Sequence, residues 1–384
     1  MAYSPKKTNK KFMLLSAIGI IMVVDSHCLN PISLFSEYMP YNSFFMPLFV
    51  FISGYFNKVD DETNLLLYLR KKENRLLLPY IVIAFTTFLI ELAIRWFKTG
   101  EIPIVSLDEF FVLFISPFTI GYPVDISGPI WFLPSLFCTL IVYAVLKKLL
   151  YRCWNSLIAF SVFCIFNIGV VWISKYFVAE YLAYLPLKCL FFLPFIELGI
   201  IYREIIEGKI RHLKGSSKII LLFILIFANM IRMMVLPSPN DILFGGIYNL
   251  SGFSSPYVIT PLVSSLIGIL FWTTLIDIFG KAIYENRLIN YISENTIIIM
   301  GFHVVFFNVL NCILKAIHSY IAPIEGFNIS EFSQTNYYFW GKENGFCLVY
   351  LFFGLAGPLL LKFFLDKIRK HFVSAGGTLS QDAN

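Results

Sequence analysis

Residues 16–56 read SAIGIIMVVDSHCLNPISLFSEYMPYNSFFMPLFVFISGYF and contain two apolar runs joined by a short polar loop. The first run ends in Asp25, Ser26 and His27, and the loop carries Glu37. An ionisable side chain inside a bilayer is expensive, so one that is kept there usually serves a function. We therefore interpret this stretch as the candidate site of the protein and the remaining chain as its scaffold.

The composition points to a membrane protein. The chain has 384 residues, of which 58% are hydrophobic and 14% are charged. Soluble proteins average roughly 45–50% apolar and about 25% charged residues. The net charge of +6 is carried mainly by basic residues between apolar runs. This placement indicates orientation in a membrane rather than binding to nucleic acid.

The apolar runs predict an all-α fold, a polytopic transmembrane helical bundle. One span needs about 20 mostly apolar residues, and by that rule the chain has about ten candidate spans. A shorter apolar segment, residues 110–120, is expected to be interfacial or re-entrant. The candidate spans are residues 12–29, 41–57, 76–97, 130–147, 153–174, 185–202, 218–236, 257–279, 295–317 and 346–366.

The loops between these spans predict the topology. Lysine and arginine gather in alternate loops, as the positive-inside rule requires of cytoplasmic loops. Both termini are then cytoplasmic. Residues 1–366 form a single transmembrane domain, and residues 367–384 form a cytoplasmic tail. The polar sequence after His371 is expected to be unstructured.

His27 is the first candidate for chemistry. It lies about 24 Å along a helix from the basic N-terminal flank, at about 1.5 Å per residue, and so towards the outer leaflet. Imidazole can take and give a proton near neutral pH. A carboxylate from Asp25 or Glu37 could fix its tautomer, and Glu37 is the better partner because residues two apart on a helix point apart. The alternative is a satisfied polar residue at a helix end.

A basic cluster precedes the third span and consists of Arg70, Lys71, Lys72 and Arg75. One interpretation is the ordinary positive charge of a cytoplasmic loop. The other is a phosphate site on the cytoplasmic face, because arginine forks match phosphate oxygens. A donor that carries nucleotide phosphates, such as coenzyme A, would suit such a site.

Three further residues are candidates for binding a substrate. Trp131 opens the fourth span between two prolines, where either an interfacial belt or a shaped entrance is expected. His303 lies inside the ninth span, and Arg232 lies near the end of the seventh. Lys188 and Glu197 also fall within a span, and such side chains often snorkel to an interface. The five histidines have no metal-binding spacing, so no metal site is predicted.

Five segments, in this order, carry a family resemblance: IGIIMVVDSHC (18–28), FFMPLFVFISGYF (44–56), RKKENRLLLPY (70–80), IWFLPSLF (130–137) and ISENTIIIMGFH (292–303). With them, the chain resembles the integral-membrane acyltransferase-3 family. This family includes the O-acetyltransferases of bacterial surface polysaccharides and the fucose 4-O-acetylase-like proteins.

The resemblance implies a multi-pass enzyme of the bacterial inner membrane. Its donor would be cytoplasmic acyl-CoA, most simply acetyl-CoA, used as a substrate and not as a tightly bound cofactor. Its acceptor would be a carbohydrate on the outer side or on a lipid carrier. The first-span histidine of the family matches His27, its acidic residue resembles Glu37, and its arginines match Arg70 and Arg75. Ser16 departs from the family, where many members carry arginine or lysine eleven residues before the histidine.

Two other functions fit a polytopic chain with intramembrane charges. A transporter of lipid-linked sugars often shows two related halves, and no such repeat is visible. A polysaccharide polymerase would be expected to carry a large basic outer loop, whereas residues 98–129 and 318–345 are modest in length and not strongly basic.

Overall fold

The computed structural model describes residues 9–32, 38–39, 41–60, 62–119, 125–176, 184–235 and 258–378. Within these ranges every regular element is a helix, which confirms the predicted all-α class. The α-helices are α1 (Lys10–His27), α2 (Phe45–Tyr55), α3 (Leu65–Lys72), α4 (Leu78–Thr99), α5 (Leu107–Thr119), α6 (Phe132–Leu149), α7 (Ser156–Tyr176), α8 (Tyr184–Ile201), α9 (Glu207–His212), α10 (Gly215–Val235), α11 (Thr260–Phe279), α12 (Arg287–Glu294), α13 (Thr296–Tyr320), α14 (Ile329–Gln334) and α15 (Cys347–Thr378).

The chain is a multi-pass membrane protein. Each predicted span contains a helix, and eight helices in the described ranges are long and apolar enough to cross a bilayer. Two predicted spans, residues 12–29 and 41–57, are not among these eight helices. Helix α1 carries Lys10, Lys11 and Asp25, and α2 has only 11 residues. At about 1.5 Å per residue α2 is roughly 16 Å long, about half of a hydrocarbon core. A count of ten complete spans stays a prediction.

The third span is longer than its apolar pattern suggests. Helix α3, a five-residue π-helical turn (Glu73–Leu77) and α4 form one 35-residue helix, Leu65–Thr99. The basic cluster therefore lies on a helix and its π-turn rather than in a loop. Single π-turns inside α-helices occur frequently at functional sites.

The C-terminal helix also extends further than predicted. Helix α15 continues to Thr378. The prediction of an unstructured end after His371 is therefore wrong for residues 372–378. Polar composition alone does not end a helix, because most polar residues cost less than about 1 kcal/mol each in a helix.

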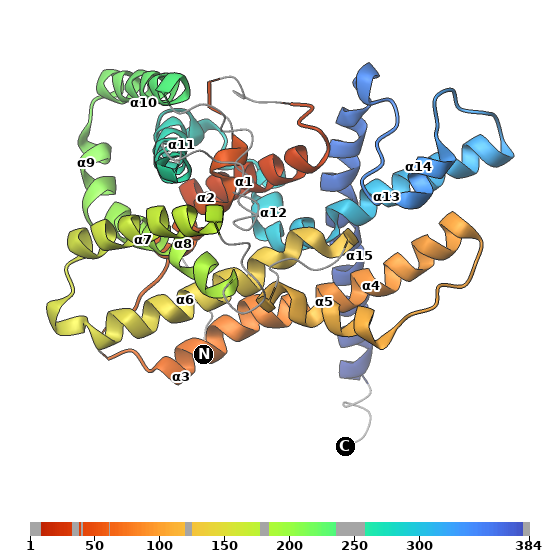
Figure 1. Ribbon diagram of the computed structural model, residues 1–384, viewed down its shortest axis with the longest axis horizontal. Helices are drawn as coiled ribbons and strands as arrows, with labels where there is room; N and C mark the ends of the chain where they lie inside the picture. Colours follow the sequence, from red (N-terminus) through yellow and green to blue (C-terminus); the bar gives the residue numbers. More distant parts are fainter. Residues whose placement is uncertain are drawn as a thin grey trace.

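Helices α1 and α2 lie in the middle of the bundle (Figure 1). Helices α6 to α10 lie on one side of them, and α4, α5, α13 and α14 lie on the other. Helix α2 packs on α8, α1 packs on α12 and α13, and α13 packs on α15. This arrangement places the end of α1, and with it His27, at the junction of the two groups.

Two glycines allow α2 and α8 to touch along their backbones. A Cβ atom on Gly54 would overlap the backbone of Ile196, and one on Gly199 would overlap the carbonyl of Phe51. Small residues at such crossings let helix backbones approach closely in membranes. The fixed contact holds α2 beside α1.

Replacing Gly54 by alanine should separate these helices. We expect Gly54→Ala to lower the free energy of unfolding by about 2 kcal/mol or more, since overpacking of this kind costs about 1–3 kcal/mol. Gly169→Ala in α7 is the matched control, because no atom lies within 4 Å of the added methyl group. Thermal unfolding of the detergent-solubilised protein measures both. Equal midpoints for the two variants would contradict the role of the contact.

Candidate active site

His27 is the last residue of α1 and is half-buried. Its Nδ1 lies 2.8 Å from the backbone carbonyl oxygen of Val23. A carbonyl oxygen only accepts, so Nδ1 donates and carries the proton of the neutral ring. The other nitrogen, Nε2, is then unprotonated and is the atom that can act as a base. The carbonyl of Val23 is thus one group that fixes this tautomer, and the predicted contact with a carboxylate of Asp25 or Glu37 stays a prediction.

Asp25 supports the turn that follows α1. Its carboxylate accepts a hydrogen bond from the backbone N–H of Ile32 at 3.0 Å and another from the hydroxyl of Tyr41. The turn contains two non-glycine residues with positive φ, Leu29 at 67° and Asn30 at 54°. Such backbone conformations are unfavourable and tend to occur at functional sites. Asp25 therefore holds the backbone beside the imidazole, whereas its own direct part in chemistry stays a prediction.

His303 of α13 lies next to His27. The two ring centroids are 5.0 Å apart and the ring planes are inclined by 51°. His303 repeats the same tautomer, because its Nδ1 donates to the carbonyl of Ile299 at 2.9 Å. The side chain is fully buried, and among the described residues its Nε2 has no hydrogen-bond partner. The structure thus joins two candidate residues that the sequence placed in separate spans.

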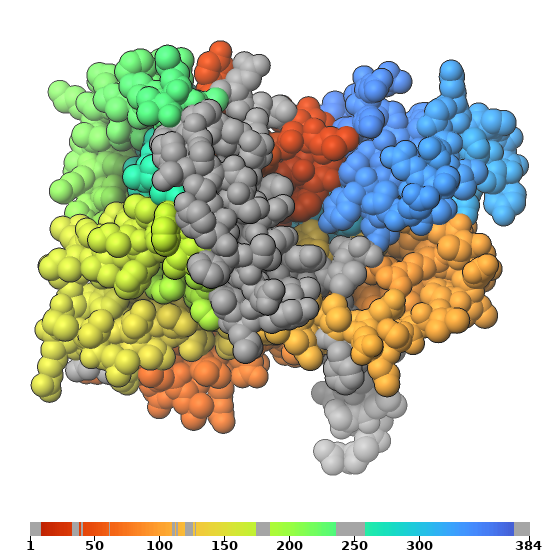
Figure 2. Space-filling model, viewed as in Figure 1, coloured from red at the N-terminus to blue at the C-terminus, as the bar shows by residue number. Residues whose placement is uncertain are grey.

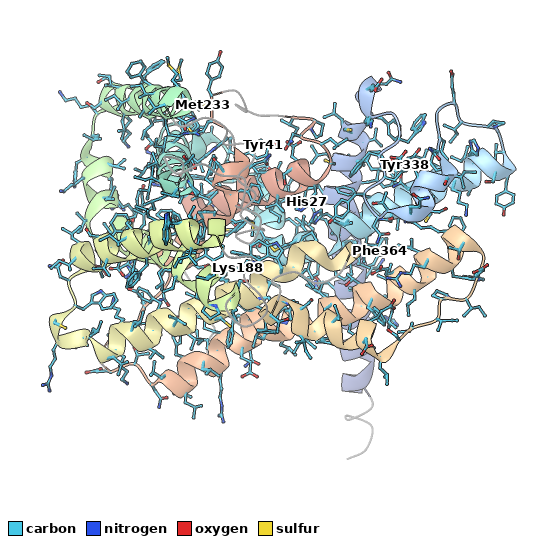
Figure 3. The ribbon with its side chains drawn as sticks, in the orientation of Figure 1. His27, Tyr41, Lys188, Met233, Tyr338 and Phe364 are labelled. Carbon is cyan, nitrogen blue, oxygen red and sulfur yellow. The ribbon has the colours of Figure 1, made fainter. Side chains whose placement is uncertain are left out.

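A loop after α14 supplies a third ring to this group. The ring centroid of Tyr337 lies 6.4 Å from that of His27. Figure 3 shows the neighbouring Tyr338 on the side of α13 and His27 at the end of α1. On the face in Figure 2, red N-terminal residues lie beside blue residues of the C-terminal part. Tyr337 was missed because nothing in its local sequence distinguishes it from other loop residues.

Trp131 is held by a buried lysine side chain. The Nζ of Lys188 lies 3.6 Å from the centre of the Trp131 ring system, and Lys188 is fully buried. Lys188 therefore does not snorkel. The contact fixes the indole at the start of α6, where the sequence predicts either an interfacial belt or a shaped entrance.

Arg232 belongs to a different cluster. It is buried, and its Nε and Nη2 donate to Asn229 Oδ1 at 3.2 and 2.8 Å. The amide nitrogen of Asn229 in turn donates to the carbonyl of Tyr38. Arg232 thus stabilises the segment that follows the first turn, and its binding of a substrate stays a prediction. Glu37, the predicted acidic partner of His27, lies outside the described residues.

The basic cluster presents unpaired charge. Arg70, Lys71 and Arg75 are exposed, and among the described residues they form no hydrogen bond or ion pair. Lys72 is half-buried, with its Nζ 5.0 Å from the ring centre of Tyr68. The segment packs against α4 and α6, so it is separate from the histidine pair.

The two lysines at the start of α1 both have acidic partners. Lys11 is buried and forms an ion pair with Asp277 at 2.7 Å. Its Nζ also donates to the hydroxyl of Tyr202 at 2.5 Å. Lys10 pairs with Glu285. Both lysines therefore stabilise the end of the bundle at which α1 begins.

These features define a helical membrane protein with an adjacent pair of histidines and a separate basic surface. The family model described as an acyltransferase domain matches residues 12–328. The chain therefore belongs to the acyltransferase-3 family and is a membrane acyltransferase. No curated protein and no solved structure matches it significantly. In the described part of the chain, no group of three or more metal-ligating side chains could hold a metal ion.

Replacing His303 by leucine should separate stability from activity. A buried polar atom without a partner costs about 1–3 kcal/mol. We therefore expect His303→Leu to keep or slightly raise the midpoint of thermal unfolding, while acyl transfer falls at least about 100-fold.

His318→Leu, in the same helix, is the control. His318 Nδ1 accepts a hydrogen bond from the N–H of Ile324 at 2.9 Å, so this variant should lose about 1 kcal/mol of stability and keep its activity. Full activity in a destabilised His303→Leu protein would show that His303 is only structural.

Proposed function

We propose that this acyltransferase moves an acetyl group from acetyl-CoA to a hydroxyl group of a cell-surface carbohydrate in the bacterial inner membrane. The acceptor is either free or attached to a lipid carrier. The observation that carries the proposal is the histidine pair, with Nε2 as the unprotonated nitrogen in both rings. Deprotonation of a weakly acidic hydroxyl needs such a base, and histidine is the usual one near neutral pH.

In the proposed reaction His27 Nε2 removes the proton of the acceptor hydroxyl. The oxygen attacks the thioester carbonyl carbon and forms a tetrahedral intermediate. Collapse of this intermediate breaks the carbon–sulfur bond, and the departing thiolate of coenzyme A takes the proton from His27. The products are the acetyl ester and free coenzyme A. The Val23 carbonyl stabilises the transient imidazolium because it accepts from Nδ1 throughout.

His303 is proposed to position the acceptor. Its Nε2 is buried and has no partner in the described part of the chain, so it can accept a hydrogen bond from a hydroxyl group held beside His27. Forming that bond would satisfy an atom that otherwise stays desolvated. A second hydroxyl on the same sugar, or the reacting hydroxyl before its deprotonation, would fit this role.

The donor is proposed to bind at the basic cluster. Arg70 and Arg75 would hold the phosphates of coenzyme A at the cytoplasmic face, with Lys71 and Lys72 adding positive charge. The absence of ion pairs at Arg70, Lys71 and Arg75 within the described residues leaves their charge available to an anion. The pantetheine arm would then run between helices towards His27.

The role of His27 predicts that His27→Ala and His27→Gln both abolish transfer while the protein still inserts. Surface polysaccharide is purified from a deletion strain complemented with wild type or a variant, and its O-acetyl groups are measured by NMR. Acetyl signals should vanish on deletion, return with wild type and remain absent with either variant, because the proposed reaction needs the Nε2 of His27 to remove the proton of the hydroxyl.

Two outcomes would count against the assignment. Full acetylation with either His27 variant would remove His27 as the base. Unchanged acetylation together with shorter or less abundant polysaccharide in the deletion strain would favour export or polymerisation.

The donor site is tested with Arg70→Ala and Arg75→Ala in purified protein. Charge-assisted hydrogen bonds contribute about 1.5–3 kcal/mol each, so each change should raise the KM for acetyl-CoA by roughly 10-fold or more. The matched control is Arg211→Ala, because Arg211 is an exposed cytoplasmic-end residue outside the cluster. A KM for acetyl-CoA that is unchanged in both variants would leave only a topological role for the cluster.

A further inference from the structure

We propose that Tyr337 forms the acceptor-side wall of the His27 site and that its ring stacks on a sugar ring of the acceptor. This inference rests on the proposed carbohydrate acceptor and names the residue that would recognise it. Tyr337 lies beyond residues 12–328, the part of the chain matched by the family model. It is therefore a feature of this chain rather than of the machinery that the match covers.

The backbone on both sides of Tyr337 is fixed to α13. The Nδ2 atom of Asn308 donates to the carbonyl of Asn336 at 2.9 Å, and the Nδ2 atom of Asn311 donates to the carbonyl of Tyr338 at 2.8 Å. Both donors are side-chain amides of α13, and both acceptors are backbone carbonyls of the loop. Two hydrogen bonds around one residue leave little freedom in its position.

Further contacts anchor the same loop from other elements. Lys98 at the end of α4 donates to the carbonyl of Thr335 at 2.8 Å. The hydroxyl of Tyr350 in α15 accepts from the backbone N–H of Trp340 at 3.1 Å. The hydroxyl of Tyr338 is buried and accepts from the N–H of Asn328 at 2.8 Å. The loop is thus a rigid support, and rigid support is what a specific binding wall requires.

The side chain of Tyr337 differs from that of its buried neighbour Tyr338 in its exposure. It is 39% exposed, whereas Tyr338 is 4% exposed. Its ring lies 6.4 Å from His27 at an interplanar angle of 31°. Its hydroxyl oxygen lies 3.4 Å from the position of a Cβ atom on Gly128, so glycine at that position keeps the space beside the hydroxyl open. Tyr337 therefore stands between His27 and the segment that leads to Trp131.

A sugar ring fits this environment. The face of an aromatic ring is electronegative, and the C–H groups on one face of a pyranose are weakly electropositive and apolar. Tyrosine provides this surface at a low cost in conformational entropy because it has only two side-chain torsions. A sugar held against Tyr337 would have its hydroxyl groups directed towards the adjacent imidazole.

The test uses purified protein, radiolabelled acetyl-CoA and unacetylated polysaccharide from the deletion strain. We expect Tyr337→Ala to raise the KM for polysaccharide roughly 10-fold, as the loss of an aromatic contact of this size implies. The KM for acetyl-CoA should stay within about twofold. Tyr337→Phe keeps the ring and should retain a KM for polysaccharide within about twofold of wild type.

Tyr320→Ala is the matched control, because Tyr320 is 85% exposed at the end of α13. Tyr337→Leu retains apolar bulk without an aromatic face and replaces the alanine variant if that variant unfolds. An unchanged KM for polysaccharide in Tyr337→Ala or Tyr337→Leu, or an equal rise for both substrates, would overturn the inference. If wild type itself fails to acetylate the polysaccharide, the proposed function fails instead.

Discussion

The structure depends on one constraint, that polar groups inside a membrane bundle must find partners within the protein because lipid offers none. Asp25 is paired with the hydroxyl of Tyr41, and Glu197 accepts from the hydroxyl of Tyr143 at 2.6 Å. Lys188 lies on the ring of Trp131. These contacts join α1, α6 and α8 to their neighbours and set the positions of the helices more strictly than apolar packing could.

In the candidate site, only some of the polar atoms have partners among the described residues. In each imidazole of the pair, Nδ1 donates to a backbone carbonyl in the preceding turn of its own helix, and Nε2 makes no part of this contact. The Nε2 atom of His303 is buried, and no partner for it lies within the described ranges. A site that must receive a polar substrate cannot satisfy all its own groups, because the substrate would then have nothing to bind. The turn after α1 also has two non-glycine residues with positive φ, a conformation that costs stability and that tends to occur at functional sites.

Much of the fold could be predicted from hydropathy, because a bilayer requires long apolar helices and penalises alternatives. The residues at which individual helices begin and end could not be predicted in this way. Helix α2 is shorter than its apolar run, α3 continues through a π-turn into α4, and α15 continues past its apolar part. The alternation of basic loops indicated an orientation but could not show that Arg70 and Arg75 lie on a helix and its π-turn.

The sequence by itself determined the all-α class, the approximate helical segments and the choice of His27 and His303 as candidates, because the cost of an ionisable group in lipid is a local property. Only the tertiary structure decided that these two rings lie next to each other and that Arg232 belongs to another cluster. It also decided that Lys188 lies on the ring of Trp131 and that Tyr337 lies near His27. Those decisions depend on contacts between α1, α8, α13 and the loop after α14. Such contacts arise from packing between distant segments, which periodicity and hydropathy do not encode.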